Sequence, residues 1–438
     1  MFKYLFVGAL LLIIFSACIE AGNTFTKMPP GPWRGVLKLD KVNSRADAPS
    51  EEDILAGKLD FEAVNPGELP FNFEVVYTDK DNFHILLKNA DEVFKITDIT
   101  WGLDRRTAKD TFTFSFPYYN AAMRGIFEEN IIEGEWILYD REDYKIPFVA
   151  YHGKNFRFTE MKKKPAADLG GMWKLTMGTD TEAPYEALGE FNTNGNYVSG
   201  SILEETGDYR YLEGTVQGDK MYLSQFDGST AYLLEAKLME DGSLQGFFRS
   251  GKHFQTTWTA VRTNEDILRN PSDIVKTTGI PFDFSFTDAK GQIISLDDPE
   301  FAGKAKIIQI LGTWCHNCYD ETRFLVEQSE KYKNEDIAII GLAFERSKDT
   351  LSAMKRIAAY QDRLNVQYPI LLAALTTKKE EAIKYLPALD QVFAFPTTIF
   401  LDKNNKIYKV HAGFYGPATS KYKYWVEEFE ETVQKLIE

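Results

Sequence analysis

The segment Trp314-Cys315-His316-Asn317-Cys318 places two thiols three residues apart. The apolar run 307–311 precedes it and Gly312-Thr313 interrupt that run, so we expect a strand to end there and a helix to begin at Cys315. At the start of a helix, free backbone N–H groups and the helix dipole lower a thiol pKa from about 8.5 to between roughly 3.5 and 7.5. Cys315 is therefore the predicted nucleophile. Cys318, one turn further on, is placed to attack a mixed disulfide formed at Cys315.

Other uses of two closely spaced cysteines are less consistent with the sequence. A structural zinc site needs a second pair of ligands. The remaining histidines each lack a close partner: His84, His152, His253 and His411. A c-type haem needs a histidine directly after Cys318, where Tyr319 stands. A purely structural disulfide usually closes a longer loop. Redox chemistry without a metal is the preferred interpretation, and the zinc and structural-disulfide interpretations stay open.

Further motifs accompany the cysteine pair. In chain order they are Ile280-Pro281-Phe282-Asp283-Phe284, Gly303-Lys304, the Gly312–Cys318 segment and Phe395-Pro396-Thr397-Thr398-Ile399-Phe400-Leu401-Asp402. With these motifs, the chain from about Thr278 onward resembles the thioredoxin superfamily, and within it the TlpA-like and ResA-like thiol-disulfide oxidoreductases. The resemblance covers a little over a third of the chain. It implies an α/β thioredoxin-like domain over residues 279–438 and protein thiol-disulfide oxidoreductase activity.

The resemblance also implies a substrate site. The matching proline of the family is cis and packs against the active-site sulfurs, which makes Pro396 a predicted catalytic residue. Its missing N–H leaves the backbone of Phe395 to pair with an extended substrate. Trp314 and Thr397 complete the predicted substrate-binding residues. The alternative is a proline that only begins an edge strand, and we disfavour it because residues 397–401 directly behind it have the pattern of a strand.

A proton acceptor is harder to assign. Thioredoxin itself carries an Asp six residues before the first cysteine, where this chain has Gln309. Relatives of the ResA type carry a glutamate in the region of Phe344-Glu345-Arg346-Ser347. Glu345 is therefore expected to tune the pKa of Cys318 and to accept its proton. The alternative is a solvated loop carboxylate paired with Arg346. A charged His316 would favour the thiolate and make the pair more oxidising, but the direction of electron flow is not fixed by the sequence.

The N-terminus has the pattern of a targeting segment. Lys3 provides a positive start, residues 5–15 form an apolar core too short to span a bilayer, and Phe15-Ser16-Ala17-Cys18 resembles a bacterial lipoprotein cleavage box, with Phe15 where Leu is usual. Residues 1–18 are thus predicted to be a lipoprotein signal peptide, with Cys18 as the lipidation site and membrane anchor. An ordinary cleaved secretory signal is the alternative. Both interpretations predict export, and the lipoprotein one a periplasm-facing location in the bacterial cell envelope.

The composition agrees with an exported globular protein. The chain has 438 residues, 44% of them hydrophobic, enough for two or three cores, and its formal net charge of −15 disfavours nucleic-acid binding. No second apolar run approaches the length of a transmembrane helix. If Cys18 is acylated, only Cys315 and Cys318 remain of the three cysteines. Such a protein is expected to act on the disulfides of other proteins rather than to need its own.

The first 260 residues have short alternating runs typical of strands. The predicted strands are 71–77, 83–87, 111–116, 208–216, 221–226 and 231–238. Gly31-Pro32-Trp33-Arg34 recurs as Gly171-Met172-Trp173-Lys174, which indicates a duplication. We therefore predict two tandem all-β modules, sandwiches or calycin-like barrels, at 24–160 and 168–263, followed by a linker at 264–278. No catalysis is assigned to them, and their expected role is to space the redox domain from the membrane or to recognise clients.

The preferred function is a lipid-anchored envelope thiol-disulfide oxidoreductase that reduces disulfide-containing envelope proteins and is recharged by a membrane electron donor. It needs no cofactor besides the Cys315–Cys318 disulfide. A peroxiredoxin-type peroxidase is disfavoured because Gly312 and Ile308 occupy the positions of its Thr or Ser and its Pro. The non-enzymatic alternative is a binding protein in which the β modules bind the ligand. Its thioredoxin domain would then be vestigial or would handle copper, since thiolates suit Cu(I).

Overall fold

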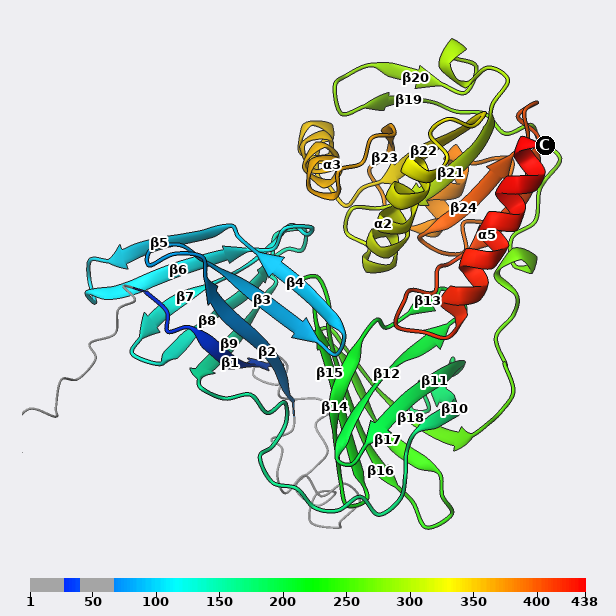
Figure 1. The fold of residues 1–438 in the computed structure, drawn as a ribbon. Coiled ribbons are helices and arrows are strands. Elements are labelled where there is room, and N and C mark those ends of the chain that lie inside the picture. The colour runs from blue at the N-terminus through cyan, green and yellow to red at the C-terminus, as the bar shows by residue number, and fades with distance from the viewer. Residues whose placement is uncertain (1–26, 40–66) are drawn as a thin grey trace, which may run out of the picture.

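The computed structural model describes residues 27–39 and 67–438, which form three sheets of nine, nine and seven strands. Figure 1 shows the first two sheets as separate β units and the third inside an α/β domain that lies against both of them. The predicted fold class, two all-β modules followed by a thioredoxin-like domain, is confirmed. The predicted signal peptide, with Cys18, lies outside the described residues.

The first β unit is a half-barrel. Its strand order is β4-β3-β2-β1-β9-β8-β7-β6-β5, so each strand pairs with its neighbours in an up-and-down pattern and the sheet stays open between β4 and β5. The strands are β1 Gly31–Lys38, β2 Glu68–Tyr77, β3 Phe83–Asn89, β4 Glu92–Ile96, β5 Ile99–Asp104, β6 Lys109–Ser115, β7 Ala121–Glu128, β8 Ile131–Leu138 and β9 Lys145–His152.

The second β unit closes into a barrel because β11 pairs with β12 as well as with β10. Closure removes the free sheet edges of this unit, apart from the two-residue strand β13. The strands are β10 Gly171–Met177, β11 Tyr185–Asn194, β12 Tyr197–Glu204, β13 Gly207–Asp208, β14 Leu212–Gln217, β15 Lys220–Phe226, β16 Ala231–Leu238, β17 Leu244–Ser250 and β18 Phe254–Arg262.

The two repeated Gly-x-Trp segments have the same structure. Trp33 and Trp173 are both fully buried, and each indole N–H donates to the backbone carbonyl four residues earlier, at 3.1 and 3.0 Å. Gly31 and Gly171 have φ values of 102° and 106°, which favour glycine. Both strands also pair with the second and the last strand of their unit. The sequence repeat is therefore a structural repeat.

The half-barrel covers the outer face of the β15–β16 hairpin of the barrel. Phe226 on β15 packs against Phe71, Phe116 and Trp136 of the half-barrel, with ring centroids 4.8, 5.7 and 5.1 Å apart. The Trp136 indole donates to the carbonyl of Gly228 in the hairpin turn at 2.9 Å. Because both faces of this hairpin are buried, its strands are apolar on both sides, and the two β units share a core.

One predicted strand is interrupted. The sequence favours a single strand over 208–216, but β13 ends at Asp208 and β14 begins at Leu212. Between them Arg210 has φ of +58° and is 1% exposed. The chain turns here because the Arg210 side chain points into a buried cluster of carboxylates, and the strand pattern gives no sign of that partner.

The thioredoxin-like domain is built around β21, which runs parallel to β22 and antiparallel to β24. Its sheet order is β20-β19-β23-β22-β21-β24-β25. The strands are β19 Ser285–Asp288, β20 Ile293–Ser295, β21 Ala305–Leu311, β22 Ile337–Phe344, β23 Ile370–Ala374, β24 Thr397–Leu401 and β25 Ile407–Ala412. The α-helices are α2 His316–Lys331, α3 Thr350–Leu364, α4 Lys379–Ala382 and α5 Lys421–Ile437. Short 3₁₀ turns lie at Pro271–Asp273, Pro299–Phe301 and Ile383–Tyr385.

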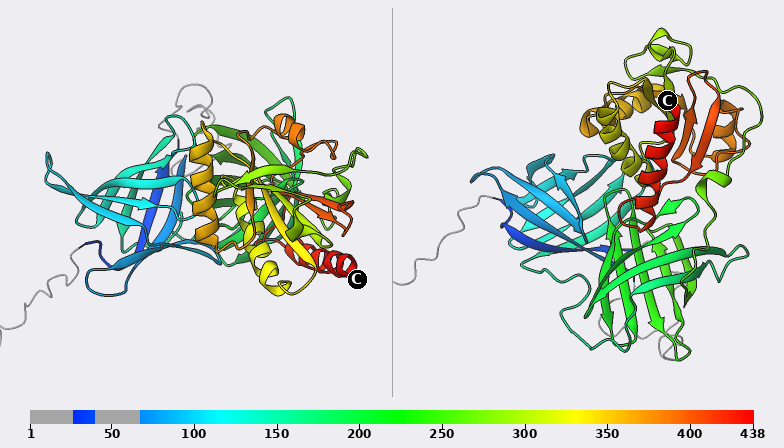
Figure 2. Two further views of the ribbon diagram at one scale, coloured as in Figure 1. Left: turned by 90° about the horizontal axis from the view of Figure 1, so that it is seen from above. Right: turned by 45° about the vertical axis from the view of Figure 1, so that its right-hand side comes forward.

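Helix α2 lies between α3 and α5. The Tyr360 hydroxyl of α3 donates to Thr322 of α2 at 3.0 Å, and Phe324 of α2 packs against Phe429 of α5 with centroids 4.9 Å apart. These contacts fix the helix that follows the cysteine motif. Figure 2 shows from two further directions that this domain rests against both β units.

Candidate active site

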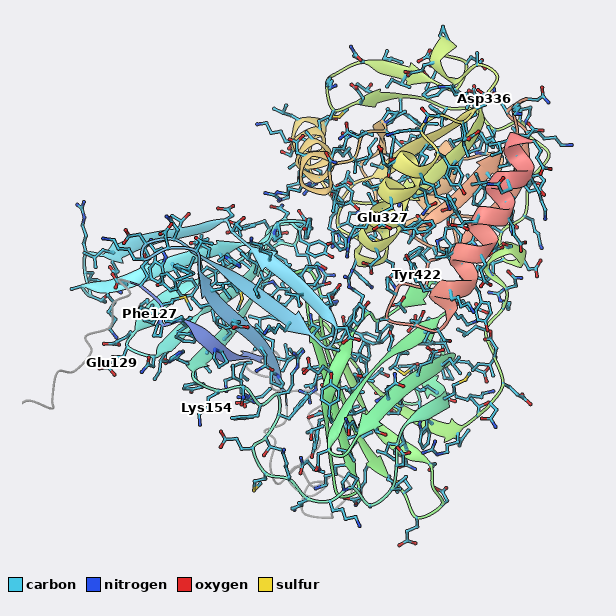
Figure 3. The ribbon with its side chains drawn as sticks, viewed as in Figure 1. Phe127, Glu129, Lys154, Glu327, Asp336 and Tyr422 are labelled. Atoms are coloured by element: carbon cyan, nitrogen blue, oxygen red, sulfur yellow. A yellow bond between two sulfur atoms is a disulfide. The ribbon has the colours of Figure 1, made fainter. Side chains whose placement is uncertain are left out.

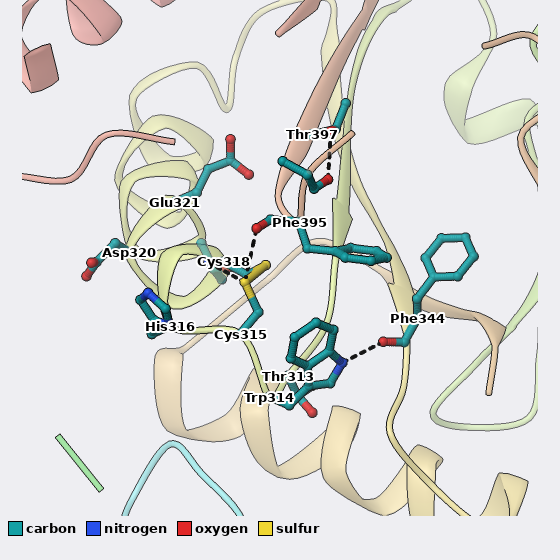
Figure 4. The surroundings of a disulfide bond; sticks show 12 residues. Thr313, Trp314, Cys315, His316, Cys318, Asp320, Glu321, Phe344, Phe395 and Thr397 are labelled. Carbon is teal, nitrogen blue, oxygen red and sulfur yellow. Dashed lines mark hydrogen bonds between the residues drawn. A yellow bond between two sulfur atoms is a disulfide. The ribbon is translucent and has the colours of Figure 1, made fainter. Parts of the chain in front are cut away.

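The cysteine pair lies where β21 ends and α2 begins, as the sequence predicts. Cys315 is the N-cap of α2, and its Sγ accepts a hydrogen bond from the Cys318 N–H at 3.2 Å. The two residues form a disulfide, drawn in Figure 4, with their Cα atoms 5.2 Å apart. Cys315 is 6% exposed and Cys318 is fully buried. Cys315 is thus the more accessible sulfur, at the helix end where a thiolate is stabilised.

The Phe395-Pro396 bond is cis and borders the disulfide. The carbonyl oxygen of Phe395 lies 3.4 Å from Sγ of Cys315, and the Phe395 ring contacts the Trp314 ring at a centroid distance of 5.6 Å. The structure therefore brings Trp314, Phe395 and Pro396 together beside Cys315. Their catalytic and substrate-binding roles stay predictions.

Trp314 and Thr397 are both held in place by backbone carbonyls. The Trp314 indole donates to the Phe344 carbonyl at 2.9 Å, and the Arg346 guanidinium lies 4.8 Å above the indole ring. Thr397 is 1% exposed and its hydroxyl donates to the Ala394 carbonyl at 2.9 Å. Trp314 faces the opening above the disulfide, whereas Thr397 is enclosed behind it, and its substrate-binding role also stays a prediction.

Glu345 lies beside the cysteine loop and is 1% exposed, so it is not a solvated loop carboxylate. Its carboxylate accepts from the N–H and the hydroxyl of Thr313 at 2.8 and 2.7 Å. Burial raises the pKa of Glu345 to about 7, against these two hydrogen bonds, which lower it. The hydrogen bonds of Glu345 therefore reach the start of the loop rather than Cys318, and its role as proton acceptor stays a prediction.

A second buried carboxyl, Glu321, lies near the cysteine pair and is not among the residues that the motifs predict. It follows Cys318 by three residues on α2 and is fully buried. It accepts from Gln309 of β21 at 2.9 Å and from Thr398 of β24 at 2.6 Å, while the same Gln309 amide lies 3.5 Å from the Cys318 carbonyl. Burial raises the pKa of Glu321 to about 7. Its i+3 spacing from Cys318 is the signal that could have identified it, because residues three apart share one helix face.

Replacing Glu321 with Gln is expected to change how stability depends on pH. The wild-type carboxyl binds its proton more tightly in the folded state, with a pKa of about 7 against 4.5 unfolded. Stability is therefore lost as pH rises from about 4.5 to 7, by roughly 3 kcal/mol. Glu321→Gln should remove this loss, so its stability relative to wild type should rise between pH 4 and pH 8. Urea unfolding of the oxidised protein at both pH values measures this.

Glu327, on the same helix but exposed, provides the matched control (Figure 3). Glu327→Gln removes the same charge without a buried partner, so it should leave the pH dependence of unfolding as in wild type. A stability difference between Glu321→Gln and wild type that stays constant with pH would contradict the raised pKa of Glu321.

The two residues between the cysteines dock on the barrel. Nε2 of His316 lies 3.3 Å from the Asp208 carbonyl, and its ring meets Tyr232 edge-on at 6.1 Å. The Asn317 amide pairs with the backbone of Asp208 at 3.2 and 3.3 Å. Burial lowers the pKa of His316 to about 4. His316 is therefore neutral at pH 7 in the disulfide-bonded state, and an effect of a charged imidazole on the reduced pair stays a prediction.

Arg210 of the barrel joins all three units at this contact. Its guanidinium forms ion pairs with Glu92 of the half-barrel and with Asp320 of α2, the latter at 2.9 Å, and donates to the His316 carbonyl at 3.1 Å. Burial opposes its charge, but Asp320 and Glu92 raise the pKa of Arg210 above its usual value. Burial also raises the pKa of Asp320 to about 6. The cysteine helix is thus fixed to both β units through one buried cation.

A cavity of about 330 Å³ opens onto Cys315 between the three units. Its walls include Tyr119 and Arg141 of the half-barrel, Tyr232 and His253 of the barrel, and Trp314 and Cys315 of the thioredoxin-like domain. The β units are therefore part of the site, although the sequence gives them only a spacing or recognition role.

Within residues 27–39 and 67–438, no group of three or more His, Cys, Asp and Glu side chains is arranged to hold a metal ion. No helix in the same ranges is both long enough and apolar enough to cross a membrane.

Comparison with known proteins agrees with this geometry. Residues 276–424 match the Redoxin family. The chain is 27% identical over 131 residues to the thioredoxin-like protein YneN of Bacillus subtilis, covering 30% of this chain and 68% of YneN. It is 31% identical over 124 residues to the thiol-disulfide oxidoreductase ResA of Bacillus thuringiensis, covering 28% of this chain and 62% of ResA. The chain thus spans a little under two thirds of the length of that ResA relative.

Solved structures match a similar share of the chain. A thiol:disulfide interchange protein of the thioredoxin family from Chlorobium tepidum is 20% identical, with a TM-score of 0.28, over 37% of this chain and 98% of that chain. A thiol-disulfide oxidoreductase from Bacteroides fragilis is 18% identical, with a TM-score of 0.27, over 35% of this chain and 99% of that chain.

The fold, the disulfide at the N-cap of α2 and the Redoxin match define a thioredoxin-superfamily domain at the C-terminal end of this chain. Within that superfamily, the matches to ResA and YneN make it a TlpA/ResA-like domain. The predicted resemblance to TlpA-like and ResA-like proteins of the thioredoxin superfamily is confirmed.

Proposed function

We propose that this protein is a thiol-disulfide oxidoreductase of the bacterial cell envelope that reduces protein disulfides through Cys315 and Cys318. One observation carries the proposal: the pair is disulfide-bonded at a helix N-cap, with the Phe395 carbonyl 3.4 Å from the accessible sulfur. A thiolate at that position has backbone N–H groups to stabilise it, and the backbone beside it is suited to hold an extended substrate.

The proposed reaction consists of two thiol–disulfide exchanges. In the reduced pair, the Cys315 thiolate attacks one sulfur of the client disulfide, forms a mixed disulfide and releases the other client sulfur as a thiolate. The Cys318 thiolate then attacks Sγ of Cys315, closes the Cys315–Cys318 disulfide and releases the second client thiolate. Two electrons pass to the client. The buried acids Glu321 and Glu345, each with a pKa of about 7, are suited to exchange the protons near neutral pH.

The location and partners are part of the same proposal. Cys18 is the proposed site of lipidation and membrane anchoring, which would make the protein a periplasm-facing lipoprotein. The clients are proposed to be envelope proteins with disulfides. A membrane electron donor for thioredoxin-like proteins would return the pair to its dithiol form. The support for these points is the N-terminal sequence pattern and the ResA-like character of the C-terminal domain.

Replacing Cys318 with Ala is expected to trap the first intermediate. Cys315 still attacks a client, but no sulfur remains to release it, so mixed disulfides with envelope proteins accumulate. Non-reducing gels and mass spectrometry of acid-quenched cells, with the variant expressed as the full chain, identify the trapped proteins.

Cys315→Ala is the matched control, because it removes the attacking sulfur and leaves the buried one. It should trap no client. Equal trapping by both variants would show that Cys315 is not the only attacking sulfur, and the absence of trapping by either would count against the proposed function.

A further inference from the structure

The cavity above Cys315 has a basic wall. Arg141 lies in the β8–β9 loop of the half-barrel, Arg346 follows β22, and Lys379 begins α4, and all three line the cavity. Among residues 27–39 and 67–438, no carboxylate forms an ion pair with any of the three. Three cations without an acidic side chain at ion-pair distance are unusual in a chain with a formal net charge of −15.

The one acid in the cavity wall does not offset this charge. Asp140 forms an ion pair with Arg356 of α3, which is not part of the cavity wall, and also accepts from Asn120 at 2.6 Å. Its closest cation, Arg356, therefore lies outside the cavity, and its weaker attraction to Arg346 leaves three cations in the wall against one acid. The space above Cys315 keeps a net positive charge.

Arg141 is held in position by neutral groups. Its Nη1 lies 3.1 and 3.0 Å from the two ring nitrogens of His253, and its guanidinium lies 5.2 Å above the Tyr144 ring. Burial, followed by the charges of Arg141 and Arg346, lowers the pKa of His253 to about 4, so the imidazole is neutral at pH 7. Neutral His253 orients Arg141 without cancelling its charge, which leaves the guanidinium available to a ligand.

We propose that this basic cavity recognises disulfides by carboxylates next to their sulfur atoms, with Arg141 of the half-barrel as a specificity-determining residue. The proposal rests on the proposed function and names the substrate class of that site. A guanidinium matches the planar geometry of a carboxylate and pairs with it through two hydrogen bonds. The cavity volume of about 330 Å³ is at the lower end of the range for small-ligand sites, so it suits a small disulfide or one short chain segment.

The chemistry needs no new reactant. The Cys315 thiolate attacks the carboxylate-bearing disulfide R–S–S–R, and the mixed disulfide Cys315–S–S–R forms as one RS⁻ leaves. Cys318 then displaces the second RS⁻ and closes the Cys315–Cys318 disulfide, so the protein dithiol is oxidised and the substrate is reduced by two electrons. A dithiol reductant, dithiothreitol in the experiment below, restores the protein.

The test compares three small disulfides that differ in charge: oxidised glutathione, which carries carboxylates, neutral bis(2-hydroxyethyl) disulfide, and cationic cystamine. The full chain is reduced with dithiothreitol, freed of it and mixed with each disulfide, and its oxidation is followed by quenching with maleimide. Each second-order rate constant is divided by that of free dithiothreitol with the same disulfide. We expect this ratio of rate constants to be about tenfold larger for oxidised glutathione than for cystamine, which corresponds to 1.4 kcal/mol. The difference should become smaller as salt is added.

Arg141→Ala is expected to remove most of this preference, and Arg141→Lys to restore part of it through the retained charge. Arg105→Ala is the matched control, because Arg105 is an exposed arginine of the same half-barrel, in the β5–β6 turn and outside the cavity. Disulfide-linked peptides with Glu or with Lys beside the cysteine extend the comparison. A charge preference confined to the peptides would identify a chain segment as the substrate, and one confined to the small molecules a low-molecular-weight disulfide.

Equal normalised rates for the three small disulfides and for the two peptides would overturn the charge preference while leaving the proposed function intact. An unchanged preference in Arg141→Ala would overturn the role of Arg141. If even the neutral disulfide fails to oxidise the protein faster than it oxidises the Cys315→Ser variant, the proposed function itself fails.

Discussion

Replacing Cys315 with Ser is expected to lower the rate of disulfide reduction by roughly a thousandfold or more, because the attacking sulfur is lost and a hydroxyl is not ionised at neutral pH. Reduction of insulin by the full chain with dithiothreitol as electron source measures the loss. Cys318 does not replace Cys315, because it is fully buried while Cys315 is 6% exposed.

The same substitution should leave folding of the reduced protein intact. Position 315 is the N-cap of α2 and accepts from the Cys318 N–H, and serine is among the residues that favour this position. Unfolding of reduced wild type and Cys315→Ser should therefore occur at similar urea concentrations. Residual activity near the wild-type level in a folded variant would show that Cys315 is not the nucleophile.

Replacing Arg210 with Ala is expected to reduce the free energy of unfolding by about 3–5 kcal/mol, the usual range when one partner of a buried ion pair is removed. Arg210 is 1% exposed and pairs with Glu92 and Asp320, which would keep no counter-ion. Burial already raises the pKa of Glu92 to about 7 and that of Asp320 to about 6. Without Arg210 these pKa values rise further, so the loss should be larger at pH 8 than at pH 5, where protonation relieves it.

Urea unfolding at the two pH values measures this effect, and Arg269→Ala is its control. Arg269 forms an exposed pair with Glu205, with contacts of 2.5 Å, and such surface pairs contribute at most about 1 kcal/mol. A loss in Arg210→Ala no larger than that in Arg269→Ala would refute the view that Arg210 connects the three units.

Local signals made much of the fold predictable. The Cys-x-x-Cys spacing, the break at Gly312-Thr313 and the proline before residues 397–401 each act within a few residues, and the cysteine pair and the cis bond at Pro396 lie where the motifs place them. The Gly-x-Trp repeat likewise indicated the duplicated β units, because its indole hydrogen bond spans only four residues.

Long-range contacts made the rest unpredictable. The bond between Arg210 and Glu92 spans 118 positions, so no strand pattern could reveal why the chain turns at Arg210. Glu321 is linked to the Cys318 carbonyl through Gln309 of β21, and this contact depends on how the sheet packs against α2. The contribution of the β units to the cavity depends on how the three units pack together, and the alternating strand pattern of the β units carries no information on that packing.

Both β units form part of the wall of the cavity at Cys315, and this limits the shape of the substrate that can reach the sulfur. Tyr232 and Arg141 line the cavity that opens onto Cys315, so a substrate has to fit a space of about 330 Å³, which suits a narrow hairpin or a chain end better than a flat protein surface. A disulfide in a narrow hairpin or near a chain end should therefore react faster than one held inside a rigid, compact domain.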